Sequence, residues 1–193
     1  MVEKRFKRPR DPVALAKPIG VEATWPSKMK KSTTDKWDKR YFGLAKLIST
    51  WSKDPKAKVG AVLLNRQNWP IALGYNGFPA GVEDDIDKLA TTKLKNKMVV
   101  HAEQNVLLGA GTRARNGTIY VYGKPVCPRC AVLIIQAGIK RVAGIQPNPK
   151  KNPKSDTHRD GKISLKMFAE AGVHFTPLDP KILKKILKKS ASK

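Results

Sequence analysis

Short apolar segments alternate with helical patterns through most of this chain, and this alternation restricts the folds available to it. Residues 59–64 and 71–74 have the length of buried strands, and a polar turn at 65–68 separates them, so they predict a hairpin. Further strands are expected at 119–122, 141–145 and 173–176. Because helical patterns separate these strands, the sequence predicts an α/β fold of three layers, with a sheet between helices.

Four helices are expected around these strands. Asp35 caps the first, in which apolar side chains recur at helical spacing as far as Ile48. The other three are expected at 101–109, 130–137 and 163–171. Residues 79–97 and 147–161 are polar or rich in proline and are expected to be loops.

A chain of 193 residues suits one packed domain with tails. The core domain is expected at 35–178. Residues 1–34 combine basic side chains with prolines, so we expect an extended arm. Residues 179–193 form a basic tail whose segment 181–189 has the pattern of an amphipathic helix; packing on the domain and contact with a partner both remain open.

The two cysteines and the hydropathy pattern indicate in which cellular compartment the protein works. No segment approaches the roughly 18 uninterrupted apolar residues of a membrane span, and no signal segment is recognisable. Cys127 and Cys130 are three positions apart, which favours a metal or redox role over a disulfide framework. We therefore expect a cytoplasmic, reducing environment without a membrane span.

The charge of the chain is strongly positive, with 39 Lys and Arg against 15 Asp and Glu and a formal net charge of +24. The excess is spread over the arm, the core and the tail. Such a field attracts nucleic acid and also small phosphorylated substrates. A generally basic surface without a specific partner is the alternative.

Two short motifs carry residue types suited to metal chemistry. His101 and Glu103 flank one residue, and Cys127 and Cys130 flank Pro-Arg; both motifs lie where a helix is expected to begin. Catalytic zinc takes three protein ligands and keeps one position open, and one imidazole with two thiolates is a suitable set. A helix N-terminus also favours ionised thiols. Glu103, close to the metal without binding it, would then move protons.

Each motif alone has a simpler interpretation. A single histidine at a helix start is commonly a cap, and a lone Cys-x-x-Cys is commonly half of a structural zinc site or a redox pair. A structural zinc would need a fourth ligand nearby, whereas His158 and His174 lie in or beyond a loop-rich segment. A redox pair would leave His101 and Glu103 unexplained, so the combination favours a catalytic zinc site.

The combination resembles the zinc deaminase signature, His-x-Glu followed by Pro-Cys-x-x-Cys. The chain is similar to the cytidine and deoxycytidylate deaminase superfamily, and within it to dCMP deaminases, from about residue 37 to about residue 177. The supporting segments are Ser52-Lys53-Asp54-Pro55, Val59-Gly60-Ala61-Val62, Gly74-Tyr75-Asn76-Gly77-Phe78-Pro79, His101-Ala102-Glu103-Gln104-Asn105 and 134–142. Val126 departs from the signature, which has proline before the first cysteine.

The resemblance implies a mixed five-stranded sheet, an oligomer, one Zn²⁺ ion, and hydrolytic conversion of dCMP to dUMP with release of ammonia. It also implies that Asn76 contacts the sugar, that Ser52 and Lys53 lie near the 5′-phosphate, and that Ala102 belongs to the substrate site. Asn76-Gly77 could instead be a tight turn, and Lys53 could be a solvated lysine.

Two other functions remain open on the sequence. The protein could deaminate a base in RNA or single-stranded DNA, which the basic arm and tail favour; such substrates need aromatic stacking surfaces, and aromatic residues are only 7% of the chain. It could also be a non-catalytic deaminase fold that binds nucleic acid. A binding module has no need of the intact proton-transfer group Glu103.

Overall fold

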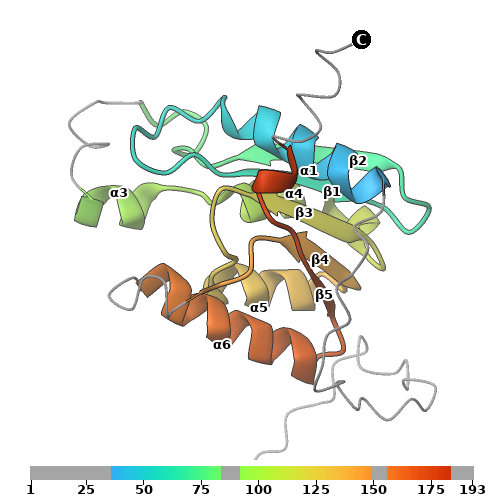
Figure 1. Ribbon diagram of the computed structural model, residues 1–193. Coiled ribbons are helices and arrows are strands. Elements are labelled where there is room, and N and C mark those ends of the chain that lie inside the picture. The colour runs from blue at the N-terminus through green and yellow to red at the C-terminus, as the bar shows by residue number, and fades with distance from the viewer. Residues whose placement is uncertain (1–35, 84–91, 149–155, 184–193) are drawn as a thin grey trace, which may run out of the picture.

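The computed structural model describes residues 36–83, 92–148 and 156–183 (Figure 1). The predicted arm at 1–34 and most of the predicted tail lie outside these ranges, so the proposed boundaries of arm, core domain and tail stay predictions. The described elements are α1 (Lys36–Ser49), β1 (Gly60–Leu64), β2 (Pro70–Tyr75), α3 (Thr92–Met98), α4 (Ala102–Ala110), the 3₁₀ helix η2 (Gly111–Ala114), β3 (Thr118–Tyr122), α5 (Pro128–Gln136), β4 (Arg141–Gly144), α6 (Asp156–Glu170) and β5 (His174–Pro177).

The five strands form one mixed sheet in the order β2-β1-β3-β4-β5. β1 pairs antiparallel with β2 and with β3, so Val62 lies between Leu73 and Tyr120. β4 pairs parallel with β3 and with β5, and α5 and α6 make the two crossovers that parallel pairing requires. The predicted hairpin and the expected mixed five-stranded sheet are confirmed.

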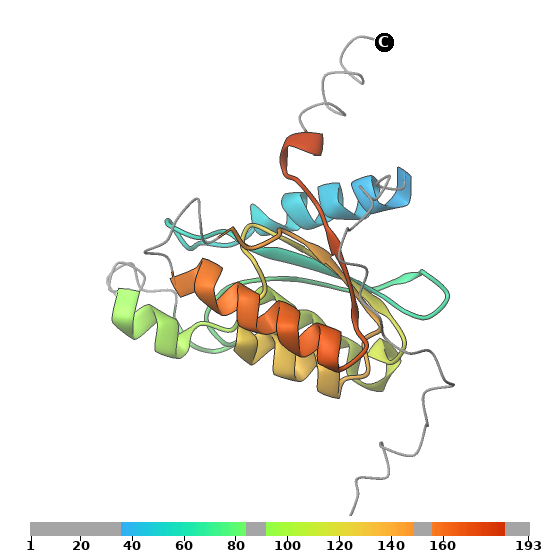
Figure 2. The ribbon, with the colours of Figure 1, turned by 60° about the horizontal axis from the view of Figure 1, so that its bottom comes forward.

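Helices cover both faces of the sheet, as Figures 1 and 2 show from two directions. α1 packs on one face, and α4, α5 and α6 cover the other. Successive side chains of a strand point to opposite faces, and accordingly Ala61 and Leu63 join the core beneath α4 and α5 whereas Val62 and Leu64 join the core beneath α1. All five residues of β1 are buried because both of its faces are covered, which confirms the predicted three-layer fold.

Gly60 allows α1 to lie directly over the start of β1. A Cβ atom at this position would collide with the backbone of α1 at Ala45 and Ser49. The helix can therefore approach the strand closely only because residue 60 has no side chain. This approach also fixes the segment between α1 and β1, which reaches the functional site described below.

Two regions differ from the prediction. Residues 92–98 form α3, most of which was expected to belong to the loop at 79–97. α6 begins at Asp156, although its first turns were expected to belong to a loop. Gly161, the last residue of that expected loop, lies inside the helix, where a Cβ atom would press on Pro125 and Pro147. Close packing with these prolines therefore explains a glycine within a helix.

The described part of the chain ends on the α1 side of the sheet. Leu178 and Leu183 are buried there with Phe42 of α1. The remainder of the amphipathic segment predicted at 181–189 lies outside the described residues. Within the described ranges, every helix is too short or too polar to cross a membrane.

Candidate zinc centre and active-site cavity

His101 occupies the N-cap position of α4. The preceding residue, Val100, forms a β-bridge with Gly77 just beyond β2. The backbone N–H of His101 donates to the side-chain oxygen of Gln104 at 2.8 Å, which caps the first turn. The bridge and the cap fix the histidine at the start of the helix, as the sequence predicts.

Cys127 and Cys130 belong to the start of α5. Cys127 is the N-cap residue, and Pro128 occupies the first helical position, where its fixed φ suits a helix and no N–H is required. Cys130, one turn further on, is completely buried. The two cysteines thus face inward from one helix start, while His101 comes from another.

The three side chains converge. The Nδ1 atom of His101 lies 3.5 Å from the Sγ atom of Cys127 and 3.3 Å from that of Cys130, and the three donor atoms lie within 4.8 Å of one another. A tetrahedral zinc, with Zn–S of about 2.3 Å and Zn–N of about 2.0 Å, places nitrogen and sulfur ligands about 3.5 Å apart. The donor set therefore fits zinc in both chemistry and spacing.

The electrostatics of this cluster favour a cation. The hydrogen bond from Cys130 lowers the pKa of Cys127 to about 4, and its counterpart raises the pKa of the Cys130 thiol. The hydrogen bond with Cys127 also raises the pKa of His101. One thiolate is thus strongly favoured, and a divalent ion is the group that stabilises a second thiolate beside it.

Glu103 lies in the first turn of α4, two residues after His101. Its side chain is buried, and burial raises the pKa of its carboxyl group. The carboxyl group is close enough to Cys130 for a hydrogen bond to that thiol, yet the metal-binding group consists of His101 and the two cysteines. This arrangement places an acid beside the three donors without making it one of them.

A cavity of about 510 Å³ opens beside the cluster. His101, Glu103 and Cys127 line it, and so does Asn76. Its remaining lining comes from the segment between α1 and β1, from α3 and the residues just after it, from the segment before α5 and its first turn, and from the start of α6. The donor cluster, the buried acid and a space for a small ligand therefore adjoin one another.

Asn76, just after β2, has its side chain turned back to the chain segment before β1. Its Oδ1 atom accepts the N–H of Val59 at 2.7 Å, and its Nδ2 atom donates to the carbonyl oxygen of Ala57 at 2.8 Å. The side chain is buried at the wall of the cavity. Asn76 is therefore more than a turn residue, because its amide fixes the cavity wall.

Comparison with known proteins identifies the family. The profile described as "Cytidine and deoxycytidylate deaminase zinc-binding region" matches residues 35–145, more than half of the chain. The chain belongs to this family. It is a zinc-dependent deaminase, and His101, Cys127 and Cys130 are positioned to hold its one zinc ion.

Individual relatives extend the match beyond the zinc-binding region. A protein named "Uncharacterized deaminase in luxG 3'region", from Aliivibrio fischeri, is 39% identical over 149 residues, which are 77% of this chain and 98% of that protein. Human deoxycytidylate deaminase is 36% identical over 157 residues, which are 78% of this chain and 84% of that enzyme. Both matches extend beyond the segment that contains the two motifs.

Solved structures show the same fold. The dCMP deaminase of cyanophage S-TIM5, in complex with dCMP and dUMP, superimposes with a TM-score of 0.59 at 24% identity. The match covers 78% of this chain and all of that chain. This likeness supports the cytidine deaminase-like architecture.

Three other predicted site residues lie around the cavity rather than in its described lining. The hydroxyl of Ser52 is buried, donates to the carbonyl oxygen of Asn76 at 2.8 Å and accepts the N–H of Asp54. Lys53 is exposed, and Ala102 is completely buried as the first residue of α4. The substrate roles assigned to these residues stay predictions.

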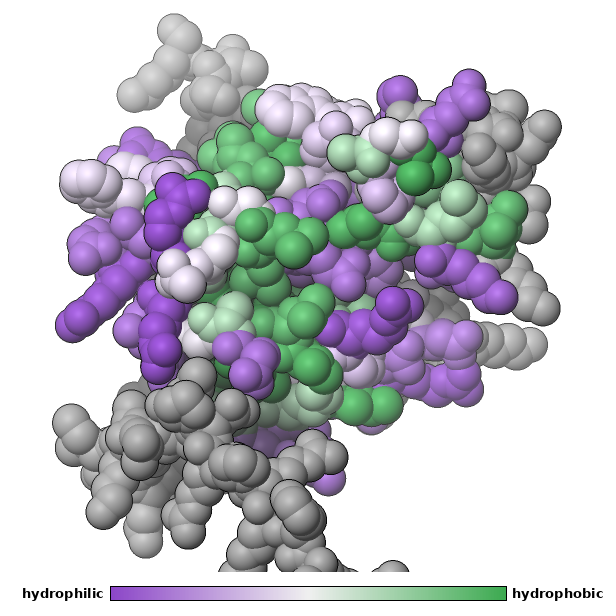
Figure 3. Space-filling view, turned by 180° about the vertical axis from the view of Figure 1, so that it is seen from behind, coloured by the Kyte–Doolittle hydropathy of each residue, from purple (hydrophilic) through white to green (hydrophobic). Residues whose placement is uncertain are grey.

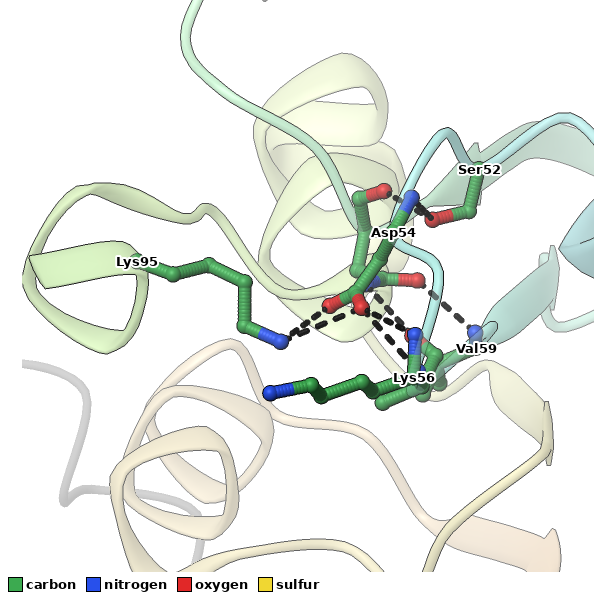
Figure 4. A network of polar contacts seen from close by, with 7 residues as sticks. Ser52, Asp54, Lys56, Val59 and Lys95 are labelled. Atoms are coloured by element: carbon green, nitrogen blue, oxygen red, sulfur yellow. Dashed lines mark hydrogen bonds and ion pairs between the residues drawn. The ribbon is translucent and has the colours of Figure 1, made fainter. Parts of the chain in front are cut away.

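The sequence did not indicate one pair of residues at the site. Asp54 and Lys95 both line the cavity and form a buried ion pair, with the Nζ atom of Lys95 2.9 Å from a carboxylate oxygen of Asp54 (Figure 4). Lys95 comes from α3, most of which was expected to be a loop, and Asp54 was quoted only as part of a segment that supports the family resemblance. No local signal distinguishes this lysine from its neighbours Lys93 and Lys97.

Proposed function

We propose that this protein converts dCMP to dUMP by hydrolysis and releases ammonia. The extent of its similarity to deoxycytidylate deaminases carries the proposal: 35% identity to the mouse enzyme and 36% to the human enzyme, each over 78% of this chain and 84% of the relative. The donor cluster, the buried Glu103 and the cavity support the same reaction.

The chemistry requires a water molecule to add to C4 of the cytosine ring and the amino group to leave. Zinc in such a site lowers the pKa of a bound water toward about 7, which makes a nucleophile available at neutral pH. Glu103 takes a proton from the attacking water and delivers it to N3 of the ring. The same carboxylate then carries a second proton to the departing amino group, so that water and dCMP yield dUMP and ammonia.

The position of Glu103 suits this role. The side chain is buried beside the metal ligands and also lines the cavity, so a ring seated there can meet both. Its place in the first turn of α4 is held by the capping bond between His101 and Gln104. A short, rigid connection thus joins one metal ligand and the proton carrier.

The cavity is large enough for a mononucleotide. Its volume of about 510 Å³ lies within the range of roughly 300–1,000 Å³ typical of pockets for small molecules. Lys124 and Arg129 line it together with Asp156 and Asp160. We propose that the 5′-phosphate lies toward the two cations, with Ser52 and Lys53 as the alternative contacts.

A substrate panel tests the proposal. Zinc-loaded protein is given dCMP, deoxycytidine, CMP, and an oligonucleotide containing cytosine and adenosine, while ammonia release is followed. We expect turnover of dCMP and none of the oligonucleotide. Turnover of the oligonucleotide alone would select the polynucleotide deaminase instead, and no turnover despite bound zinc would select a non-catalytic binding protein.

We further propose that the protein assembles into a homo-oligomer. Seen from behind, apolar side chains gather across the middle of the surface (Figure 3). The exposed apolar side chains of the described residues include Leu108 on α4 and Val132 and Leu133 on α5, two helices that pack against each other. Sedimentation would test this, and replacing Leu108 by Glu should shift an oligomer toward the monomer.

We also propose a cytoplasmic location and a nucleic-acid partner for the basic arm and tail. A nucleotide deaminase with two unpaired cysteines suits a cytoplasmic environment, where thiols stay reduced. Contact of nucleic acid with the basic arm and tail would weaken steeply with salt, so a salt titration of oligonucleotide binding tests it.

A further inference from the structure

A buried ion pair stands in the wall of the cavity. The Nζ atom of Lys95 lies 3.1 Å from Oδ1 and 2.9 Å from Oδ2 of Asp54, and the side chains are only 5% and 4% exposed. Both residues line the cavity together with Asn76 and Glu103. Figure 4 shows Lys95 reaching from α3 to Asp54.

Asp54 also organises the 52–59 loop, the segment of residues 52–59 that leads into β1. Its Oδ1 atom accepts the backbone N–H groups of Lys56 at 2.8 Å and Ala57 at 3.0 Å. Burial raises the pKa of Asp54, but the hydrogen bonds from Lys95 and from these two N–H groups lower it by more, so the net shift of the pKa is downward. The carboxylate is therefore held charged at the point where the loop meets α3.

The Asn76 amide depends on the same loop. The Oδ1 atom of Asn76 accepts the N–H of Val59, and one N–H of its Nδ2 atom donates to the carbonyl oxygen of Ala57. The Nδ2 atom also lies 3.5 Å from Oδ2 of Asp54. The same carboxylate oxygen is 2.9 Å from Lys95. Lys95 thus holds the carboxylate, and the second N–H of Asn76 is bound only weakly by it.

We propose that Lys95 and Asp54 are positioning residues that act through Asn76. Asp54 shapes the loop that orients the amide, and Lys95 keeps the carboxylate from capturing the N–H that Asn76 offers to the sugar of the substrate. This inference rests on the proposed function and on the proposed sugar contact of Asn76. It assigns the ion pair to substrate affinity rather than to proton transfer, which belongs to Glu103.

The energetics of buried ion pairs agree with such a role. Desolvation of two charges offsets most of their attraction, so replacing a buried pair by uncharged groups of similar volume is often neutral for stability. A charged pair at the wall of a cavity therefore needs another reason, and the adjacent amide provides one. The Asp38–Arg141 ion pair, whose residues do not line the cavity, offers a matched control.

The test compares two neutralised pairs in zinc-loaded, full-length protein. For the double variant Asp54→Asn with Lys95→Met, we expect a normal zinc content, a KM for dCMP raised about tenfold or more and a kcat within about threefold of the parent. Affinity for dUMP, measured by calorimetry, should fall by a similar factor. The control, Asp38→Asn with Arg141→Met, should keep both kinetic constants and the dUMP affinity.

Several results would overturn the inference. They are an unchanged KM in the folded cavity-side double variant, an equal rise in KM in the control, a loss confined to kcat, or failure of the neutralised pair to fold, since that would make it a structural pair. Failure of the proposed function is distinguishable, because the parent protein would then neither convert dCMP nor bind dUMP.

Discussion

Two ion pairs with buried carboxylates join distant parts of the described residues, and their surroundings differ. Asp54 and Lys95 connect the 52–59 loop to α3 at the wall of the cavity. Asp38 and Arg141 connect α1 to β4, where the Nη2 atom of Arg141 lies 2.8 and 2.7 Å from the two carboxylate oxygens. Both carboxylates are almost completely buried.

The Asp38–Arg141 pair is surrounded by further hydrogen-bond partners from the core of the fold. The hydroxyl of Tyr120 donates to Asp38 at 2.7 Å, and Arg141 also donates to Tyr120 and to Thr176. Every partner there belongs to α1 or to the sheet, so this pair can only hold the layers together. The first pair faces a space that a ligand can fill, which shows that the same interaction serves the fold in one region and the site in the other.

The largest expected effect is that of Lys95→Met alone. It leaves the charge of Asp54 buried without its cation, so we expect the free energy of unfolding to fall by about 3–5 kcal/mol and the KM for dCMP to rise. Urea unfolding and initial rates measure the two quantities. In the double variant with Asp54→Asn, the free energy of unfolding should return most of the way to the parent value, whereas the KM should stay raised. A return of both to the parent values would show that the cavity-side pair, like the Asp38–Arg141 pair, serves only the fold.

Arg141→Met should cost somewhat less. Arg141 is 28% exposed, so water can partly solvate Asp38 once the guanidinium is gone, and we expect a loss of about 2–3 kcal/mol in the free energy of unfolding. Urea unfolding of the zinc-loaded variant measures this loss. Because the pair lies away from the cavity, kcat and KM should not change at temperatures where the protein is folded; a raised KM would contradict the comparison.

Acid should affect the cavity-side pair in a predictable direction. The pKa of Asp54 is lower in the folded protein than its usual 3.8, so its contribution to stability is present above that value and is lost as the pH falls through the folded pKa. Denaturant unfolding between pH 2 and pH 5, compared with Asp54→Asn, should show a smaller pH dependence in the variant. Equal curves would place the acid sensitivity elsewhere.

The smallest effect is expected for Lys97→Met, the matched control on α3. Lys97 is exposed on the same helix as Lys95, so its replacement should change the free energy of unfolding by less than about 0.5 kcal/mol. KM should be unchanged. A KM change as large as that of Lys95→Met would show that the charge of α3, rather than the ion pair, matters.

The sequence predicts the parts of this structure that have local signals. Strand and helix periodicity is visible within ten residues, and the metal ligands occur in two short motifs at helix starts, so the layers and the donor set can be predicted. The ion pairs have no such signal. Lys95 pairs with a residue 41 positions away and Arg141 with one 103 positions away. The chain has 39 Lys and Arg residues, and nothing in the sequence marks which of them the fold buries.

The same limit explains α3. Its sequence alternates lysines with other residues and has only two apolar residues, Leu94 and Met98, so hydrophobic periodicity alone predicts a polar loop. Lys95 is buried in the folded protein because Asp54 meets it at the cavity wall. The helix at α3 therefore goes with a tertiary contact, the Lys95–Asp54 ion pair, rather than with a local sequence pattern.

The most direct test of the account is Glu103→Gln, with zinc and turnover measured on the same sample. Glutamine keeps the shape of the side chain but cannot carry protons, and the three metal ligands are untouched. We expect one zinc per chain and a kcat for dCMP lowered by about 10²–10⁴-fold. Turnover close to that of the parent, or loss of the metal with the substitution, would contradict the assignment of Glu103 as the proton carrier beside an independent zinc site.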